Sequence, residues 1–291
     1  MKKILCCLAL LFALTGCKDA VSGVTNGDEA LITVGKTEIT KNDVYTGLKT
    51  ENGVSSIISK TTSYIVDKEV PVTDEIKKEA NEYLAEVKKS ISDANWKAFL
   101  ETMGYENDQQ YIDERVILSV QANKLTTTYI NDNYDQLKED FQIRKVQIFE
   151  TTDSKVAAEV QEKVKKGELT IPEAVKAYKD KVVTTTFTGN DQVITNAASL
   201  DSSIIENIMK VTEDGKLLDV YQFSADLKKF YVVKVVSIDV KLDEARDTLL
   251  GISSVADKGF AHYLEKYGFT IYDIDVFNGI NAQAPTYIVQ K

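Results

Sequence analysis

Histidine and cysteine, two residue types that often act in catalysis and metal binding, are scarce in this chain of 291 residues. The cysteines all stand near the start, at Cys6, Cys7 and Cys17. The single histidine, His262, lies in a helical pattern, where a lone histidine is usually a surface or packing residue, so we assign it no role. Asp273 and Asp275 alternate along an expected strand, but no further oxygen ligands follow at the spacing of a cation-binding loop, and we expect both to face water. The sequence therefore predicts no metal site and no cofactor.

Cys17 ends a segment with the composition of an export signal. A basic start at Lys2 and Lys3 precedes an apolar run over residues 4–14 that is too short to span a bilayer. The run closes with Leu14-Thr15-Gly16-Cys17, which resembles the lipobox of bacterial lipoproteins, in which the cysteine thiol carries a diacylglyceryl group. Two or more acyl chains anchor a protein stably. We expect cleavage before Cys17 and lipid anchoring on the outer face of the cell membrane of a Gram-positive type of bacterium; an ordinary secretory signal is the alternative.

The charge and the cysteine positions restrict what the exported part can be. The formal net charge is -10, and loss of Lys2 and Lys3 makes it -12. The remaining basic residues are interleaved with acidic ones, which argues against a nucleic-acid partner. No cysteine follows Cys17, so no internal disulfide can form and stability must come from packing. The length is enough for two compact units, each with a core.

The first part of the exported chain has a predominantly helical pattern. Residues 18–28 are small and polar and are predicted to be a flexible tether. A strand and turn over residues 31–39 then lead to a helix capped by Thr40, with Asp43 three residues later. Helical periodicity continues to about residue 141. One short apolar face consists of Trp96, Phe99, Leu100 and Met103 and stops at Gly104; we interpret it as a core face in preference to a surface that grips a ligand.

From residue 143 the pattern alternates between strands and helices. Strands are predicted at residues 144–149, 182–187, 217–223 and 230–238, with helices from Asp153, from about residue 170 and over 202–211. A final helix over residues 243–267 precedes a terminal strand at 269–274, expected to pair with the strand near Leu31. The sequence thus predicts an α+β protein in which a mixed sheet-and-helix domain is inserted into a helical one.

This order of elements resembles the PrsA foldase lipoproteins and their SurA-type relatives. The resemblance begins at residues 32–43 (ITVGKTEITKND) and continues through residues 64–70 (YIVDKEV) and 72–79 (VTDEIKKE). It implies the following organisation: a signal peptide over residues 1–16, a lipidated tether over 17–28, a helical chaperone domain over 29–141, a parvulin-like domain over 142–239, and a C-terminal helix and strand over 240–291 that complete the chaperone domain.

The inserted domain resembles a parvulin, a peptidyl-prolyl isomerase fold with four strands covered by helices. Residues 143–148 (IRKVQI) and 230–235 (FYVVKV) correspond to its first and last strands. Parvulins carry a histidine on each of these strands, and the corresponding positions here are Gln147 and Tyr231. An amide and a phenol do not supply the hydrogen-bonding geometry of imidazole, so we favour an inactive domain with no catalytic residues. Weak activity through a remaining hydrogen-bond network is the other interpretation.

The resemblance implies a foldase or chaperone that helps exported proteins to fold after translocation, mainly by holding unfolded segments. The expected partners are unfolded or partly folded exported polypeptides and, through lipid, the membrane; a homodimer is left open. One alternative is an active peptidyl-prolyl isomerase, which would accelerate rotation about X-Pro bonds. Another is a solute-binding lipoprotein, but that class requires two α/β lobes in place of a long helical start.

Overall fold

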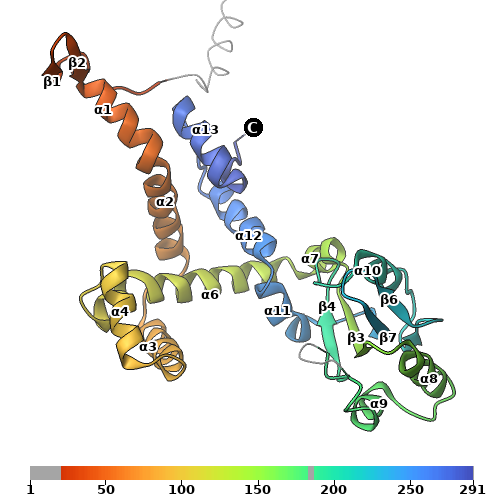
Figure 1. The fold of residues 1–291 in the computed structure, drawn as a ribbon. Coiled ribbons are helices and arrows are strands. Elements are labelled where there is room, and N and C mark those ends of the chain that lie inside the picture. Colours follow the sequence, from red (N-terminus) through yellow and green to blue (C-terminus); the bar gives the residue numbers. More distant parts are fainter. Residues whose placement is uncertain (1–20, 183–186, 291) are drawn as a thin grey trace, which may run out of the picture. The chain divides into compact units, whose positions relative to one another are not determined.

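The computed structural model describes residues 21–182 and 187–290, which divide into two compact units (Figure 1). Unit 1 is drawn from Met1–Thr126 and Ala256–Lys291, and unit 2 is Thr127–Val255. The predicted signal peptide, with Cys6 and Cys7, and the predicted lipid-attachment residue Cys17 lie outside the described residues. The α+β fold class is confirmed, since one unit is mainly helical and the other contains a mixed array of helices around a five-stranded sheet.

Unit 1 begins with a β-hairpin and a capped helix. Strands β1 (Ala30–Val34) and β2 (Thr37–Thr40) are antiparallel, and the connecting Gly35 has a φ of 64°, a value that favours glycine at the first central position of a tight turn. Helix α1 (Lys41–Leu48) follows. The predicted cap is confirmed: the Thr40 hydroxyl accepts a hydrogen bond from the Asp43 amide at 3.2 Å, and the Asp43 carboxylate accepts one from the Thr40 amide at 2.8 Å.

The other elements of unit 1 are helices. In chain order they are η1 (Lys49–Gly53), α2 (Val54–Glu69), α3 (Asp74–Lys89), α4 (Asp93–Met103), α5 (Asp108–Tyr111), η2 (Ile112–Val116), α6 (Ile117–Asp132), α12 (Ser253–Lys266), α13 (Ile274–Gln283) and η3 (Pro285–Tyr287), with α6 and α12 continuing into unit 2. Gly104 ends α4 with a φ of 81°, as predicted. The predicted apolar face of α4 is only half buried: Trp96 and Leu100 are in the core, whereas Phe99 and Met103 are exposed.

The predicted C-terminal strand is wrong. Residues 269–273 are not in a strand, β1 pairs with β2 instead, and α13 begins at Ile274 with Asp273 as its N-cap. The backbone of Ile271 bonds to the side-chain amide of Gln290, whose Oε1 accepts from the Ile271 amide at 2.6 Å and whose Nε2 donates to the Ile271 carbonyl at 3.3 Å. The Gln290 side chain therefore bonds to the same backbone groups of Ile271 that a partner strand would use. The predicted final helix is also divided, because α11 (Leu242–Leu250) ends at Gly251 before α12 begins.

Unit 2 is built on a sheet centred on β3 (Arg144–Thr151) and β7 (Lys229–Ser237), which pair antiparallel. The shorter strands are β4 (Gln192–Ile194), β5 (Lys216–Leu217) and β6 (Gln222–Ser224), so the sheet has five strands and not the four expected. Val182 forms an isolated bridge with Thr151, and the rest of the strand predicted there lies largely outside the described residues. The helices of this unit are α7 (Tyr134–Phe141), α8 (Ser154–Lys165), α9 (Ile171–Ala177), α10 (Ser202–Met209) and α11.

The two faces of this sheet carry separate cores. One face packs against α10 and contains Ile148, Tyr231 and Val233. The other packs against α8 and α9 and contains Phe149 and Val232. A third cluster joins the end of α6 to α7 and α11. In neither unit does a described helix have the length and apolarity needed to cross a bilayer.

Candidate functional site

The sheet of unit 2 separates Gln147 and Tyr231, the two positions that the sequence resemblance matched to the parvulin histidines. In the β3–β7 register Gln147 is opposite Lys234, and Tyr231 is opposite Glu150. Because side chains alternate along a strand, Tyr231 lies on the face of Ile148, and Gln147 lies on the opposite face. The separate core clusters of the two faces agree with this assignment. The two positions therefore cannot line one common site.

Tyr231 is also enclosed. Its side chain is 1% exposed, and its ring meets Phe187 edge to face at 6.2 Å. Burial, with smaller effects from Glu150 and Asp201, raises the pKa of Tyr231 to about 12. The Gln147 side chain instead donates a hydrogen bond to Asp191 Oδ1 at 2.8 Å. Neither group is arranged to act on a peptide bond.

Glu150 is a buried acidic residue that sequence reasoning did not single out. It lies on the face of Tyr231, is 2% exposed and forms an ion pair with Lys229. Its burial keeps it from substrate, so its role is structural. The alternation of apolar residues along β3 with this one acid among them is the signal that could have identified it. No group of three or more histidine, cysteine or acidic side chains suited to a metal occurs among the described residues.

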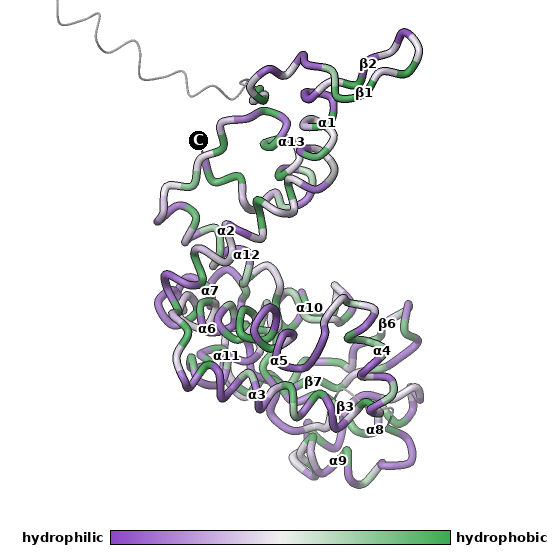
Figure 2. Tube along the Cα trace, turned by 90° about the vertical axis from the view of Figure 1, so that its left-hand side faces the viewer, coloured by the Kyte–Doolittle hydropathy of each residue, from purple (hydrophilic) through white to green (hydrophobic). Residues whose placement is uncertain are grey.

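Unit 1 offers a different kind of site, a set of exposed apolar side chains on the hairpin and α1. The hydropathy colours of Figure 2 show hydrophobic residues among hydrophilic ones along this part of the chain. Every residue of β1 is exposed, and β2 is nearly as open. We call the exposed apolar side chains of this region the hairpin strip. It consists of Leu31, Ile32, Val34, Ile39, Val44 and Leu48, with exposures of 52%, 55%, 66%, 38%, 42% and 58%. Single exposed apolar residues are normal, but Ile32, Val34 and Ile39 lie on one face of the hairpin, and a group of this kind is typical of an interaction surface.

The backbone of the hairpin adds to this surface. In the described part of the chain β1 and β2 pair only with each other, so each has an outer edge of N–H and C=O groups open to another strand. Ile32 is paired with Ile39 across the hairpin, which places two strip residues side by side. An isolated two-stranded hairpin is marginally stable in water and gains from a third strand or an apolar cover. The geometry thus favours an extended, apolar polypeptide as ligand.

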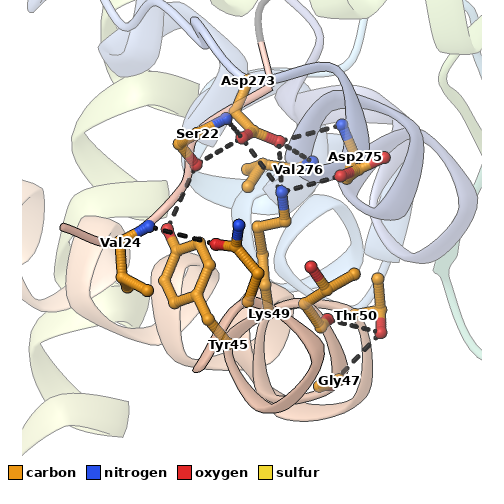
Figure 3. Close-up of polar contacts among 11 residues, drawn as sticks. Ser22, Val24, Tyr45, Gly47, Lys49, Thr50, Asp273, Asp275 and Val276 are labelled. Atoms are coloured by element: carbon orange, nitrogen blue, oxygen red, sulfur yellow. Dashed lines mark hydrogen bonds and ion pairs between the residues drawn. The ribbon is translucent and has the colours of Figure 1, made fainter. Parts of the chain in front are cut away.

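Lys49, directly after α1, fixes this helix to the C-terminal segment (Figure 3). Its side chain is 5% exposed and its Nζ lies 3.1 Å from Asp273 Oδ2 and 2.7 Å from Asp275 Oδ2. Burial alone lowers the pKa of Lys49, but the hydrogen bonds and charges of the two carboxylates outweigh it and the pKa is raised. The expectation that Asp273 and Asp275 face water is therefore wrong, because they are the partners of a buried lysine.

The Asp273 carboxylate contacts three segments of unit 1: the N-terminal segment at Ser22, the start of η1 at Lys49, and the first turn of α13. It caps α13 by accepting from the amides of Asp275 at 2.9 Å and Val276 at 3.0 Å, and it accepts from the Ser22 amide at 2.7 Å. Burial opposes ionisation, yet the hydrogen bonds from Ser22 and Val276 and the contact with Lys49 hold the pKa of Asp273 well below its ordinary value. The Ser22 hydroxyl also contacts Tyr45 at 3.1 Å. Part of the segment predicted to be a free tether is thus bound to the fold.

Comparisons with known proteins give matches among solved structures. The chain is similar to the foldase protein PrsA from Streptococcus pneumoniae, with 15% identity, 89% of this chain and 100% of that chain covered and a TM-score of 0.44. It is similar to the peptidylprolyl isomerase PrsA from Bacillus cereus, with 17% identity, 89% and 100% covered and a TM-score of 0.42. A SurA-like chaperone from Campylobacter jejuni matches with 13% identity, 80% and 91% covered and a TM-score of 0.24.

No protein-family model matches the sequence, and no curated protein matches it.

Proposed function

We propose that this protein is a lipid-anchored extracytoplasmic chaperone of the foldase type that holds unfolded segments of exported polypeptides. The observation that carries the proposal is the hairpin strip, where apolar side chains and open strand edges occur together. Apolar burial is non-directional, and backbone edges bond to any extended sequence, so such a surface accepts many clients. The chemistry required is adaptable contact and not a convergent catalytic group.

Unit 2 supports holding over catalysis. Gln147 and Tyr231 lie on opposite faces of the sheet, and the second of these side chains is in the core. A peptidyl-prolyl isomerase needs its groups within reach of one X-Pro bond, which this arrangement does not provide. We therefore propose that unit 2 is a parvulin-like fold without isomerase activity.

The anchoring half of the proposal is supported by the lipobox-like Leu14-Thr15-Gly16-Cys17 and by the binding of Ser22. An extended chain spans at most about 3.5 Å per residue, so the link from Cys17 to Ser22 reaches about 17 Å. The end of unit 1 that contains α1 and the start of α13 would then stay near the membrane surface. Replacing Cys17→Ala is expected to release the protein into the medium; retention in the membrane fraction would contradict the anchor.

The holding activity is tested with the purified chain beginning at residue 18 and an unfolded client that aggregates, without ATP. Suppression of light scattering is expected, and Ile32→Thr with Val34→Thr should reduce it several-fold, because threonine keeps the strand preference but removes apolar surface. Val220→Thr is the matched control, since Val220 is 63% exposed and lies in unit 2, compared with 66% for Val34. Unchanged aggregation at a molar excess of wild type would refute the proposal.

Light scattering at several protein concentrations distinguishes two possible occupants of the hairpin strip, a client polypeptide and a second copy of the chain. If the strip were covered by self-association, wild type would form dimers that the threonine variant does not form, and holding would fall as the protein concentration rises. A monomer that holds clients supports the proposal.

A further inference from the structure

Unit 1 contains a small aromatic pocket away from the residues of the hairpin strip. It lies between α2 and the segment after α12 and is lined by Lys60, Thr61, Tyr64, Ile65, Tyr267 and Phe269. Ile65 forms a buried floor at 1% exposure, whereas Tyr64 and Tyr267 remain 56% and 39% exposed. The two tyrosine rings meet edge to face, with centroids 6.0 Å apart at 79°. An apolar cavity with two open aromatic walls is suited to receive one apolar side chain.

The walls are held in place before any ligand arrives. The Tyr267 hydroxyl donates to Glu69 Oε1 at 2.6 Å, and Lys266 Nζ lies 2.5 Å from the same oxygen. Lys266 also lies over the Tyr267 ring at 5.7 Å, and Lys68 lies over the Tyr64 ring at 5.8 Å. A side chain that enters therefore meets rings whose freedom is already restricted, which lowers the entropic cost of binding.

The rim of the pocket is basic. Lys60, Tyr64 and Lys68 are spaced four apart on α2, so the two lysines flank the tyrosine on one helix face. Glu69 is occupied by Lys266 and Tyr267, but in the described ranges no carboxylate lies within ion-pair distance of Lys60 or Lys68. Asp67 and Glu69 are the two acids next to Lys68 in sequence, and Asp67 accepts a hydrogen bond from the Gln121 side chain at 3.2 Å. On a chain of net charge -10, two uncompensated lysines beside an apolar pocket favour an acidic ligand.

We propose that this pocket binds a large apolar side chain that is flanked by carboxylates in an extended polypeptide segment. The proposal rests on the proposed function, because exported clients would supply such segments, and it gives that function a sequence preference. The apolar side chain occupies the space between Tyr64 and Tyr267, and the flanking carboxylates approach Lys60 and Lys68. The hairpin strip supplies general affinity, whereas the pocket selects one position of the client.

The test uses three fluorescently labelled, unstructured ten-residue peptides and fluorescence anisotropy with the chain from residue 18. Their centres are Asp-Leu-Asp, Asp-Ala-Asp and Lys-Leu-Lys. The first should bind with the lowest Kd. Tyr64→Ala should raise this Kd about tenfold, which corresponds to about 1.4 kcal/mol. Tyr83→Ala is the matched control, because Tyr83 is 55% exposed on α3 of the same unit, and it should leave the Kd unchanged.

Lys60→Glu tests the contribution of charge and leaves both tyrosine walls of the pocket in place. It should weaken the Asp-Leu-Asp peptide and strengthen the Lys-Leu-Lys peptide, and salt should reduce both effects. Equal Kd values for the three peptides, or equal losses in Tyr64→Ala and Tyr83→Ala, would overturn the proposal. Self-association that depends on Tyr64, with no peptide binding, would also overturn it, since a second copy would be the occupant. If the Asp-Leu-Asp peptide binds as expected but client aggregation is not suppressed, the proposed chaperone function is refuted, whereas the proposed peptide specificity of the pocket is supported.

Discussion

At the scale of single residues, Asp273 connects the N-terminal segment, the start of η1 and α13. A carboxylate that is 12% exposed and meets a lysine that is 5% exposed would be costly to bury without partners. Here the amides of Ser22, Asp275 and Val276 supply hydrogen bonds to it. The ion pair is therefore part of a nearly complete network. Removal of Lys49 should leave Asp273 without an ion-pair partner, and removal of Asp273 should leave Asp275 as the remaining carboxylate on Lys49.

The first prediction concerns Asp273→Asn. It should lower the free energy of unfolding by about 3 kcal/mol at neutral pH, the lower end of the cost of breaking a buried pair, because Asp275 still contacts Lys49. The pKa of Asp273 is depressed in the folded state, so its stabilisation is full above the unfolded pKa of about 3.9 and is lost as the pH falls further. Urea unfolding at pH 7 and at pH 3 should show a smaller difference at pH 3. Asp275→Asn, at a side chain that is 35% exposed, is the milder control.

The second prediction addresses Gln147 and Tyr231, which the sequence resemblance matched to the parvulin histidines. Gln147→His combined with Tyr231→His should not produce isomerase activity, because the side chains lie on opposite faces of the sheet. Tyr231→His should also destabilise unit 2, since it places a polar ring at a core position that is 1% exposed. A proline-limited refolding assay measures the activity. Acceleration by the double variant would show that the two positions share a site and would contradict our assignment.

Among single residues, contacts between near neighbours in sequence could be predicted, whereas contacts between distant residues could not. The caps at Thr40 and Thr170 are local, because the hydroxyl and the carboxylate three residues later bond to each other's backbone, and the sequence indicates them directly. Asp273 also makes a local cap, but its pairing with Lys49 spans 224 residues. Composition does not reveal such a contact. The faces of Gln147 and Tyr231 likewise depend on strand register, which a motif does not specify.

At the scale of elements, the hairpin is unusual because its formation buries almost nothing. Its strands are exposed throughout, so turn geometry and the strand ladder must maintain it. The strand and turn over residues 31–39 were predictable from β-branched residues on both sides of Gly35. The incorrect C-terminal strand had similar residues, but the Gln290 side-chain amide bonds to its backbone at Ile271, and Asp273 caps the helix that begins at Ile274. Strand preference shows where an extended segment lies and not what pairs with it.

The third prediction tests the hairpin as an element. Gly35→Ala introduces a side chain at a φ of +64°, which costs about 1–2 kcal/mol for an L-residue. Because the hairpin packs on no core, we expect faster amide exchange over residues 30–40 and weaker client holding, with global unfolding unchanged. Gly104→Ala is the matched control, since Gly104 also has a positive φ, +81°, and open space around it, but ends a helix with a buried face. It should lower the unfolding free energy and spare the exchange of the hairpin.

At the scale of the whole molecule, the chain runs through unit 1, then unit 2, then unit 1 again. Each unit has its own buried clusters, one set around Trp96 and around Val54 and another around Phe149, Tyr231 and Leu249. The inserted unit 2 therefore has hydrophobic cores of its own, separate from those of unit 1. A protein with separate cores can unfold in more than one step, because loss of one core does not remove the contacts of the other.

The fourth prediction uses this division to locate the proposed holding activity. Phe149→Ala removes a side chain that is fully buried in the sheet of unit 2, which should cost about 3–5 kcal/mol of local stability. Calorimetry should show one transition at lower temperature and a second one unchanged. Between the two, the variant should still suppress client aggregation, because the hairpin strip belongs to unit 1. If holding disappears together with the first transition, unit 2 supplies part of the client surface, and the strip alone does not account for the function.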